Sequence, residues 1–360
     1  MENLHFIFCH GLNGSGQYDE SYKKHPYWGG KSGDMIAEYN NKGYRAYAAS
    51  VSPQGSAWDR ACELYAQIAG VKTDYGRAHS EKYRHARFGK DYSNQPLIPA
   101  WNEKTRIVLI GHSFGGATIR LLSALLSDGS EEERKVTPDN EISDLFKGGM
   151  SERIFAIVTL AAPTNGTSAY SLGMDPNFNA DKTGLPFYYQ IIGKITSAFT
   201  AIKKSDRDPQ DYADYDMIPD NAMALNKTIP TLANVYYFSV AANATYMDSD
   251  GTWKPNRTIM DALFMNNSVN MGKYTGTTPG GYVIDEKWFP NDGLVNTYSA
   301  RAPFDAPQKN FDKNNIEKGI WNIMPDYIAD HGAFQGGFFK KHNPRPFFDG
   351  LLKMISDLPR

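Results

Sequence analysis

A single serine is embedded in glycines in the stretch GHSFGG at residues 111–116. An apolar run at 105–111 predicts a strand before it, and the spacing at 114–127 predicts an amphipathic helix after it. Serine at such a strand–helix turn is typical of a nucleophile elbow, where it takes an unfavourable backbone conformation and the glycines let strand and helix pass closely. The alternative is a plain tight loop. In this context we interpret Ser113 as a nucleophile.

A serine hydroxyl is a poor nucleophile until an adjacent base accepts its proton. Such elbows are followed along the chain first by an acid and then by a histidine. Of the eight histidines, only His331 and His342 lie beyond Ser113 and the later predicted strands. His342 falls in the basic, proline-containing stretch KKHNPRP, whereas His331 falls in DYIADHGAF, a loop of small residues. We therefore select His331 as the base.

The acid must lie between these two residues and orient the imidazole. Asp292, in the stretch PNDGLVN, is one candidate, although Asp-Gly is also a strong turn signal. The residues alone leave Asp285, Asp305 and their neighbours open.

Acyl chemistry at a serine also needs backbone N–H groups aimed at the developing oxyanion. Phe114, directly after the serine, would supply one. The stretch FCHGLNGSG follows the first predicted strand and predicts the second at Leu12, with an ordinary turn as the alternative.

These residues must be positioned by alternating strands and helices. Strands are predicted at 4–9, 44–51, 105–111, 153–163 and 234–242, and helices at 33–43, 57–70 and 114–127. The alternation predicts a mainly parallel sheet covered on both faces. The segments 71–100, 167–233 and 243–280 are polar or irregular and are predicted to be insertions, and the Ser/Glu-rich stretch 127–135 is predicted to be a solvated loop.

Composition narrows the classes of function. The 360 residues are 41% apolar and carry a formal net charge of −2, which gives no electrostatic case for nucleic-acid binding. No apolar run reaches the ~18 residues that a membrane helix needs, and the first residues do not match a secretory signal. Two isolated cysteines, Cys9 and Cys62, predict buried apolar side chains and not a disulfide or thiolate metal site.

Several motifs occur together in the order known from one family. They are HGLNGSG, YWGGKSGD, the long block WDRACELYAQIAGVKTDYGRAHSEKYRHARFG, GHSFGG, NDGLVNT and DH. On these motifs the sequence resembles bacterial true lipases of the thermoalkalophilic Geobacillus type, with staphylococcal and clostridial lipases as relatives, from about residue 5 to about residue 350. The resemblance implies a single α/β-hydrolase domain over 1–360, with a mainly parallel central sheet flanked by helices.

The resemblance also implies an activity and its residues. The activity is hydrolysis of carboxylic esters with long or bulky acyl groups. Ser113 would be the nucleophile, Asp292 the acid and His331 the base. The backbone amides of Leu12 and Phe114 would form the oxyanion hole.

A structural zinc ion is part of the same resemblance. The positions that match its ligands, two aspartates and two histidines, are Asp59, His79, His85 and Asp211. A closed shell of four oxygen and imidazole ligands suits a structural Zn²⁺. It would tie the polar insertion 71–100 to the segment near Asp211. Asp208, Asp214 and Asp216 crowd the same stretch and leave the choice of the fourth ligand open.

The sequence departs from this lipase type at three places. Where carboxylates bind calcium after the catalytic histidine, the chain has Ala333 and Phe338, which puts calcium there in doubt. The stretch between Thr167 and Asp211 is shorter than the helical lid, so we expect a more open site with weaker interfacial activation. Phe114 stands where glutamine is usual, a change that keeps the amide donor.

We expect a serine esterase or lipase that forms an acyl-enzyme. The aromatic segment 185–199 would suit bulky or polymeric esters, including polyesters, or is an ordinary helix packed on the core. An acyltransferase using the same three residues is the first alternative. A non-catalytic binding protein is the second, but such proteins usually lose one of the three. The resemblance implies secretion with the leader peptide missing from this sequence, while the residues alone leave a cytoplasmic location open.

Overall fold

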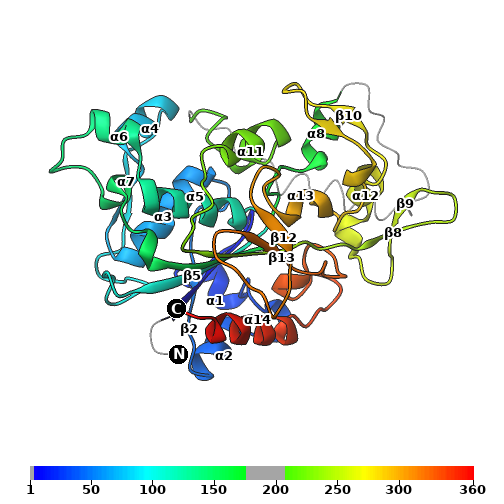
Figure 1. The fold of residues 1–360 in the computed structure, drawn as a ribbon, viewed down its shortest axis with the longest axis horizontal. Coiled ribbons are helices and arrows are strands. Elements are labelled where there is room, and N and C mark those ends of the chain that lie inside the picture. Colours follow the sequence, from blue (N-terminus) through cyan, green and yellow to red (C-terminus); the bar gives the residue numbers. More distant parts are fainter. Residues whose placement is uncertain (1–3, 176–206) are drawn as a thin grey trace.

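A fully parallel seven-stranded sheet forms the centre of the computed structural model, which describes residues 4–175 and 207–360 (Figure 1). The strand order is β12-β13-β7-β6-β5-β1-β2, and every neighbouring pair is parallel. In chain order the strands are β1 (Leu4–Cys9), β2 (Arg45–Ala49), β5 (Arg106–His112), β6 (Ile154–Leu160), β7 (Tyr236–Val240), β12 (Gln308–Asn310) and β13 (Trp321–Ile323). Three antiparallel pairs lie outside this sheet: β3 (Lys72–Asp74) with β4 (Phe88–Asp91), β8 (Thr245–Met247) with β9 (Trp253–Pro255), and β10 (Gly276–Thr277) with β11 (Val283–Ile284).

Helices connect and cover the strands. In chain order they are α1 (Glu20–Lys24), α2 (Met35–Asn41), α3 (Ala57–Ala69), α4 (Arg77–Tyr83), α5 (Gly115–Asp128), α6 (Glu131–Val136), α7 (Asp144–Lys147), α8 (Ser168–Met174), α10 (Ala213–Asp216), α11 (Pro219–Asn226), α12 (Ala262–Met271), α13 (Thr297–Arg301) and α14 (Arg345–Asp357). Single 3₁₀ turns lie at η1 (Gly30–Ser32), η2 (Ser151–Arg153), η3 (Glu286–Trp288) and η4 (Ala333–Gln335). In the described part of the chain, no helix combines the length and apolarity needed to cross a bilayer.

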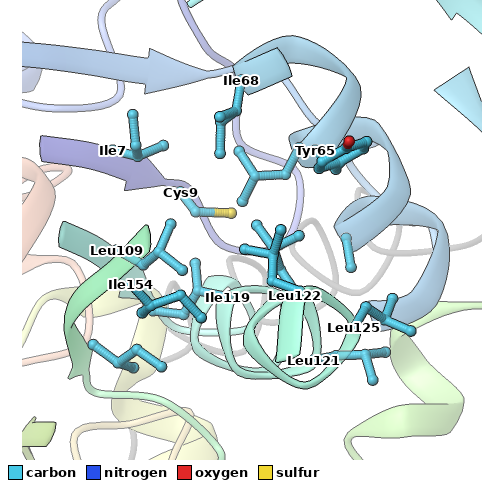
Figure 2. Close-up of a cluster of buried hydrophobic side chains, with 14 of the residues drawn as sticks. Ile7, Cys9, Tyr65, Ile68, Leu109, Ile119, Leu121, Leu122, Leu125 and Ile154 are labelled. Carbon is cyan, nitrogen blue, oxygen red and sulfur yellow. The ribbon is translucent and has the colours of Figure 1, made fainter. Parts of the chain in front are cut away.

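The two faces of the sheet bury separate apolar clusters. Side chains alternate along a strand, so Ile7 and Cys9 of β1 join the cluster under α3 and α5 (Figure 2). Phe6 and Phe8 of the same strand join the cluster under α2 and α14. Burial on both faces explains why these strands are continuous apolar runs and not alternating ones.

Helix α3 has clear local start and stop signals. The Ser56 side chain caps its first turn by accepting a hydrogen bond from the Asp59 N–H (3.2 Å), and Gly70 ends it in the left-handed conformation (φ 66°). The side chains of the residues from Ala61 to Ile68 are all buried. The helix is therefore fixed against α5 and the sheet, which fixes the two polar residues in its first turn, Asp59 and Arg60.

The predicted core strands and helices are confirmed with small shifts at their ends. Residues 4–9 form β1 as predicted, and the predicted helix at 57–70 is α3. The short strand β12 at the sheet edge, the short strand β13 beside it and the helix α14 were not predicted. The prediction of a solvated loop at 127–135 is wrong: α6 begins at Glu131, and Glu133 is buried against α4. The segment 185–199 lies outside the described residues, and so does most of the stretch compared with the lid.

Candidate active site and metal centre

Ser113 sits in a strained turn between β5 and α5. Its φ is +55°, in the left-handed region that non-glycine residues rarely adopt, which typically costs ~1–3 kcal/mol. A Cβ on Gly111 would lie 2.4 Å from the Gly115 carbonyl oxygen, and one on Gly115 would lie 2.3 Å from that of Cys9 in β1. The glycines therefore have the role expected for them, because no larger residue fits where strand and helix meet.

Asp292 and His331 form a buried hydrogen-bonded pair. The Nδ1 of His331 donates to the Oδ2 of Asp292 at 2.8 Å, and the backbone N–H of His331 donates to the Asp292 carbonyl at 3.0 Å. The other carboxylate oxygen, Oδ1, accepts the N–H groups of Leu294 (2.9 Å) and Val295 (2.7 Å). Because Nδ1 donates, the neutral ring keeps its lone pair on Nε2, the arrangement that a general base needs.

His112 connects the turn at Ser113 directly to the His331 loop. Its Nε2 donates to the His331 carbonyl at 2.9 Å, and the two rings lie 4.9 Å apart between centroids. The Tyr27 hydroxyl then donates to the Nδ1 of His112 at 2.6 Å. Burial, with a further contribution from the neighbouring His331, holds the pKa of His112 well below its usual value, so this ring stays neutral. The residue preceding the serine thus fixes the backbone of the histidine.

The loop after β1 packs against Ser113. A Cβ on Gly11 would lie 2.6 Å from the Cβ of Ser113 and 3.1 Å from its Oγ, so only glycine allows this approach. Leu12 follows at once. Among the described residues, neither the N–H of Leu12 nor that of Phe114 has a hydrogen-bond acceptor. These two amides are therefore free to bind an oxygen atom beside the serine.

A second polar cluster joins α3, α4 and the segment after residue 206. Asp59, His79, His85 and Asp211 each bring one oxygen or nitrogen atom to within 4.8 Å of the others, so the group could hold a metal ion. The Nε2 of His79 lies 3.1 Å from Asp59 and 3.2 Å from Asp211, and the Nε2 of His85 lies 3.8 Å and 3.2 Å from the same carboxylates. The structure thus brings together the four residues predicted as ligands.

Two potential metal-ligand atoms of this cluster have no hydrogen-bond partner among the described residues. The Nε2 of His85 and the Oδ1 of Asp211 are buried and make no hydrogen bond. Because the Nδ1 of His85 donates to the Ala86 carbonyl (2.9 Å), the lone pair of the neutral ring is on Nε2 and faces the cluster. The residues present therefore fit a metal ion.

Sequence reasoning missed two residues that support the cluster. Arg207 pairs with both aspartates. Glu133 in α6 accepts the backbone N–H groups of Ala78 (3.0 Å) and His79 (2.8 Å) and so fixes the start of α4. Burial alone would lower the pKa of His79, but the neighbouring Asp211 and Asp59 carboxylates outweigh it and raise that pKa. No spacing signal in the sequence marks Glu133 or Arg207.

The residues that the sequence left open as alternative acids, bases or metal ligands have other partners in the structure. For the acid, Asp285 caps the 3₁₀ turn η3 through the Lys287 N–H, and Asp305 is exposed. His342 bonds to the Tyr327 hydroxyl at 2.6 Å. Near Asp211, the other three aspartates have separate partners: Asp208 contacts Arg84, Asp214 contacts the Tyr170 hydroxyl, and Asp216 accepts the Ala57 N–H.

With this geometry the chain resembles known lipases over its length. A family model described as "Lipase-like, C-terminal domain" matches residues 2–178. The sequence is 32% identical to a lipase of Staphylococcus hyicus over 355 residues, which cover 92% of this chain and 53% of that protein. The structure matches that of EstA from Clostridium botulinum, with a TM-score of 0.85 and 32% identity, over 100% of this chain and 88% of the other. The chain belongs to this family of bacterial lipases.

A further member, lipase 1 of Pelosinus fermentans, matches over the whole of both chains with a TM-score of 0.81 and 29% identity. The chain spans about half the length of the curated staphylococcal relatives that it matches, 53% for one and 50% for another. The α/β-hydrolase fold expected from the sequence is confirmed by the parallel sheet and by these structural matches.

Two family positions associated with calcium lie beside the active site. Ala333 is buried in η4, and the Phe338 ring packs on Phe264 with 5.8 Å between centroids. The loop after His331 is instead held by Asp261, whose Oδ2 accepts the N–H groups of Phe339 (2.6 Å) and Lys340 (2.8 Å). Whether the protein uses calcium stays a prediction from these residue types.

Proposed function

We propose that this protein is a serine hydrolase that cleaves carboxylic esters through an acyl-enzyme on Ser113. The observation that carries the proposal is the buried Asp292–His331 pair, held by His112 next to a serine in a strained turn. Each of the three groups has the environment that its role requires. Membership of a lipase family supports the same reaction class.

In the proposed mechanism the Nε2 of His331 accepts the hydroxyl proton as Ser113 Oγ attacks the ester carbonyl. The negative charge that forms on the carbonyl oxygen is bound by the N–H groups of Leu12 and Phe114. His331 then gives its proton to the departing alcohol, leaving an ester on Ser113. A water molecule, deprotonated by His331, attacks that ester and releases the acid.

Throughout the cycle Asp292 keeps one imidazole orientation. Its Oδ1 is held by the Leu294 and Val295 amides, so Oδ2 cannot swing away from Nδ1 without losing them. The carboxylate also stabilises the imidazolium that forms at each proton transfer.

Hydrolysis of p-nitrophenyl esters from acetate to palmitate tests this proposal. Wild-type protein should release p-nitrophenol, and Ser113→Ala should lose this activity while keeping the thermal unfolding temperature of the wild type. Equal activity in both proteins would refute the assignment of the nucleophile.

The substrate class follows from the family resemblance, which supports long or bulky esters such as triacylglycerols and extends to polyesters. The aromatic segment 185–199 lies outside the described residues and lends no support here. The rates of hydrolysis of emulsified triglyceride and of polyester film, compared with those of short aryl esters, test this substrate assignment. Cleavage of the short esters alone would refute the substrate assignment and leave the reaction class intact.

We further propose that the metal is a structural Zn²⁺. Bonds of 2.0–2.1 Å in a tetrahedron place ligand atoms about 3.3 Å apart. The imidazole and carboxylate atoms lie 3.1–3.8 Å apart, and the four ligand atoms all lie within 4.8 Å of one another. All four side chains are taken up by the cluster, so the ion would act on stability and not on the ester. Elemental analysis of purified protein should find one zinc per chain, and Asp211→Asn together with His85→Gln should abolish it.

We also propose, from the resemblance to Geobacillus and staphylococcal lipases, that the protein acts outside the cell. Fractionation of the native host should then find the esterase activity in the culture medium. Activity confined to the cell extract would refute this.

A further inference from the structure

A fully buried arginine lies under the loop that carries Leu12. Arg60, in the first turn of α3, is 0% exposed. Among the described residues it forms no ion pair with a carboxylate. Its guanidinium donates instead to uncharged acceptors, which are the carbonyls of His10, Gly11 (3.4 Å) and Ser52 (3.2 Å), the Thr118 hydroxyl (2.9 Å) and, at 3.9 Å, the Cys9 sulfur.

These contacts fix the direction of the Leu12 amide. In a trans peptide the carbonyl of one residue and the N–H of the next point in opposite directions. The Gly11 carbonyl accepts hydrogen bonds from Arg60 (3.4 Å), from the Nδ1 of His10 (2.8 Å) and from the Gly14 N–H (3.3 Å). The N–H of Leu12 must therefore point away from the guanidinium.

The same guanidinium contacts the residue that carries the second amide. It lies 5.1 Å from the ring centroid of Phe114, within the range of a cation–π contact. The Thr118 hydroxyl, which accepts from Arg60, donates in turn to the Phe114 carbonyl at 3.3 Å. Arg60 thus contacts Phe114 through its ring and, by way of Thr118, through its backbone. Phenylalanine in place of the usual glutamine gives the guanidinium an aromatic face to pack on.

We propose that Arg60 is a positioning residue for the oxyanion hole, which sets the orientation of the Leu12 amide and packs against Phe114 while remaining out of reach of the substrate. This inference rests on the proposed ester hydrolysis at Ser113. A planar guanidinium suits the task because its donors point in fixed directions and its face can stack on a ring.

The charge of Arg60 acts in the same direction as its hydrogen bonds. Without a paired carboxylate, a buried positive charge favours negative charge nearby, including that on an oxyanion. His10 reports this field: burial, with a further contribution from Arg60, lowers the pKa of His10 to about 3. His10 therefore stays neutral and adds only its hydrogen bond to Gly11.

Arg60→Met tests the proposal in the 360-residue chain, with Arg60→Lys and Thr118→Val as milder variants. Arg120→Met is the matched control, since Arg120 is also buried (3% exposed) but bonds to Asn226 on α11. On p-nitrophenyl butyrate, Arg60→Met should lower kcat by roughly 100- to 1000-fold, the loss typical for an oxyanion donor, with little change in KM. Arg60→Lys keeps the positive charge but loses the planar guanidinium, so its kcat should lie between those of the wild type and Arg60→Met. The folded fraction of Arg120→Met should keep the kcat of the wild type.

An inhibitor pair separates positioning from general loosening of the fold. An alkylboronic acid forms a tetrahedral adduct on Ser113 that uses the oxyanion hole, whereas a non-hydrolysable ether of the same chain length does not. The inhibition constant of the boronic acid should rise in parallel with the loss of kcat across the Arg60 variants, and that of the ether should stay constant.

The outcomes separate this inference from the proposed function. A wild type without Ser113-dependent hydrolysis would refute the function itself. An active wild type with Arg60→Met no worse than Arg120→Met, or with both inhibitors weakened equally, would refute only the role of Arg60. If Arg60→Met does not fold, Thr118→Val tests the role of Arg60 in its place. An unchanged kcat and an unchanged boronic acid affinity in Thr118→Val would also overturn the inference.

Discussion

Asp292→Asn should nearly abolish activity while leaving the fold intact. The Oδ1 of Asp292 accepts two backbone N–H groups, so the asparagine carbonyl must take that position and its NH₂ must take the place of Oδ2. An amide NH₂ cannot accept the Nδ1 proton of His331, which now lies 2.8 Å from Oδ2. The imidazole should therefore switch its proton to Nε2 and lose the lone pair that activates Ser113.

The size of this effect follows from the loss of the base. A wrong tautomer typically costs about 10⁴-fold in kcat, or about 5.4 kcal/mol of transition-state stabilisation. The cost to folding should be smaller, about 1–3 kcal/mol for one charge-assisted hydrogen bond. Steady-state hydrolysis of p-nitrophenyl butyrate measures the first quantity, and urea unfolding measures the second.

Asp285→Asn and Asp305→Asn are the matched controls, since both aspartates were alternatives for the acid in the sequence. Neither contacts His331, and both variants should keep kcat within about twofold, as expected for surface changes away from the site. If Asp292→Asn retained more than about a tenth of the activity, or if Asp285→Asn lost as much, the triad reasoning would be refuted.

Three further predictions concern the metal cluster, the His331 loop and the elbow. Removing the metal with a chelator should lower the unfolding temperature by roughly 5–10 °C, because an ion at a free concentration ~1000-fold above its Kd contributes about 4 kcal/mol. Calorimetry with and without re-added zinc measures this shift. An unchanged unfolding temperature would contradict a structural ion. Burial, with the Asp261 and Asp292 carboxylates adding to it, raises the pKa of Asp330 from 3.8 to about 6, so the folded state keeps a proton that the unfolded state releases. Stability should therefore fall by about 3 kcal/mol as the pH rises from about 4 to about 6, and urea unfolding should find that Asp330→Asn lacks this fall. Gly115→Ala should cost activity and at least ~1–3 kcal/mol of stability, because its Cβ would lie 2.3 Å from the Cys9 carbonyl oxygen; a variant with wild-type stability would show that β1 and α5 can move apart.

The sequence alone predicted those features that depend on local pattern. Apolar runs located the central strands, and the glycines around Ser113 predicted its turn because the reason for them, close approach of strand and helix, is local. The neighbouring strands β12 and β13 are three residues each, too short for a periodicity to mark them. The residues alone also left the acid undecided, since the hydrogen bond between Asp292 and His331 joins positions 39 residues apart.

Charged residues whose partners are distant were the hardest to predict. Glu133 belongs to a run of three glutamates that suggested a solvated loop, and two of the three are indeed exposed. The third is buried because Ala78 and His79 present unpaired N–H groups at the start of α4. Nothing in the run itself distinguishes Glu133, so only the packing of α6 against α4 assigns it.

Asp59 and Arg60 show how adjacent residues of one helix serve two different sites. Each step along an α-helix turns the side chain by about 100°, so Asp59 faces the cluster with His79 while Arg60 faces the carbonyls after β1. The resemblance identified Asp59 through a ligand pattern, but no pattern marks an arginine whose acceptors are backbone carbonyls. The same buried turn of α3, capped by Ser56, thus fixes both a proposed metal ligand and the proposed support of the oxyanion loop. A substitution that moves the start of α3 must therefore disturb both the metal cluster and the loop after β1, whichever side chain it replaces.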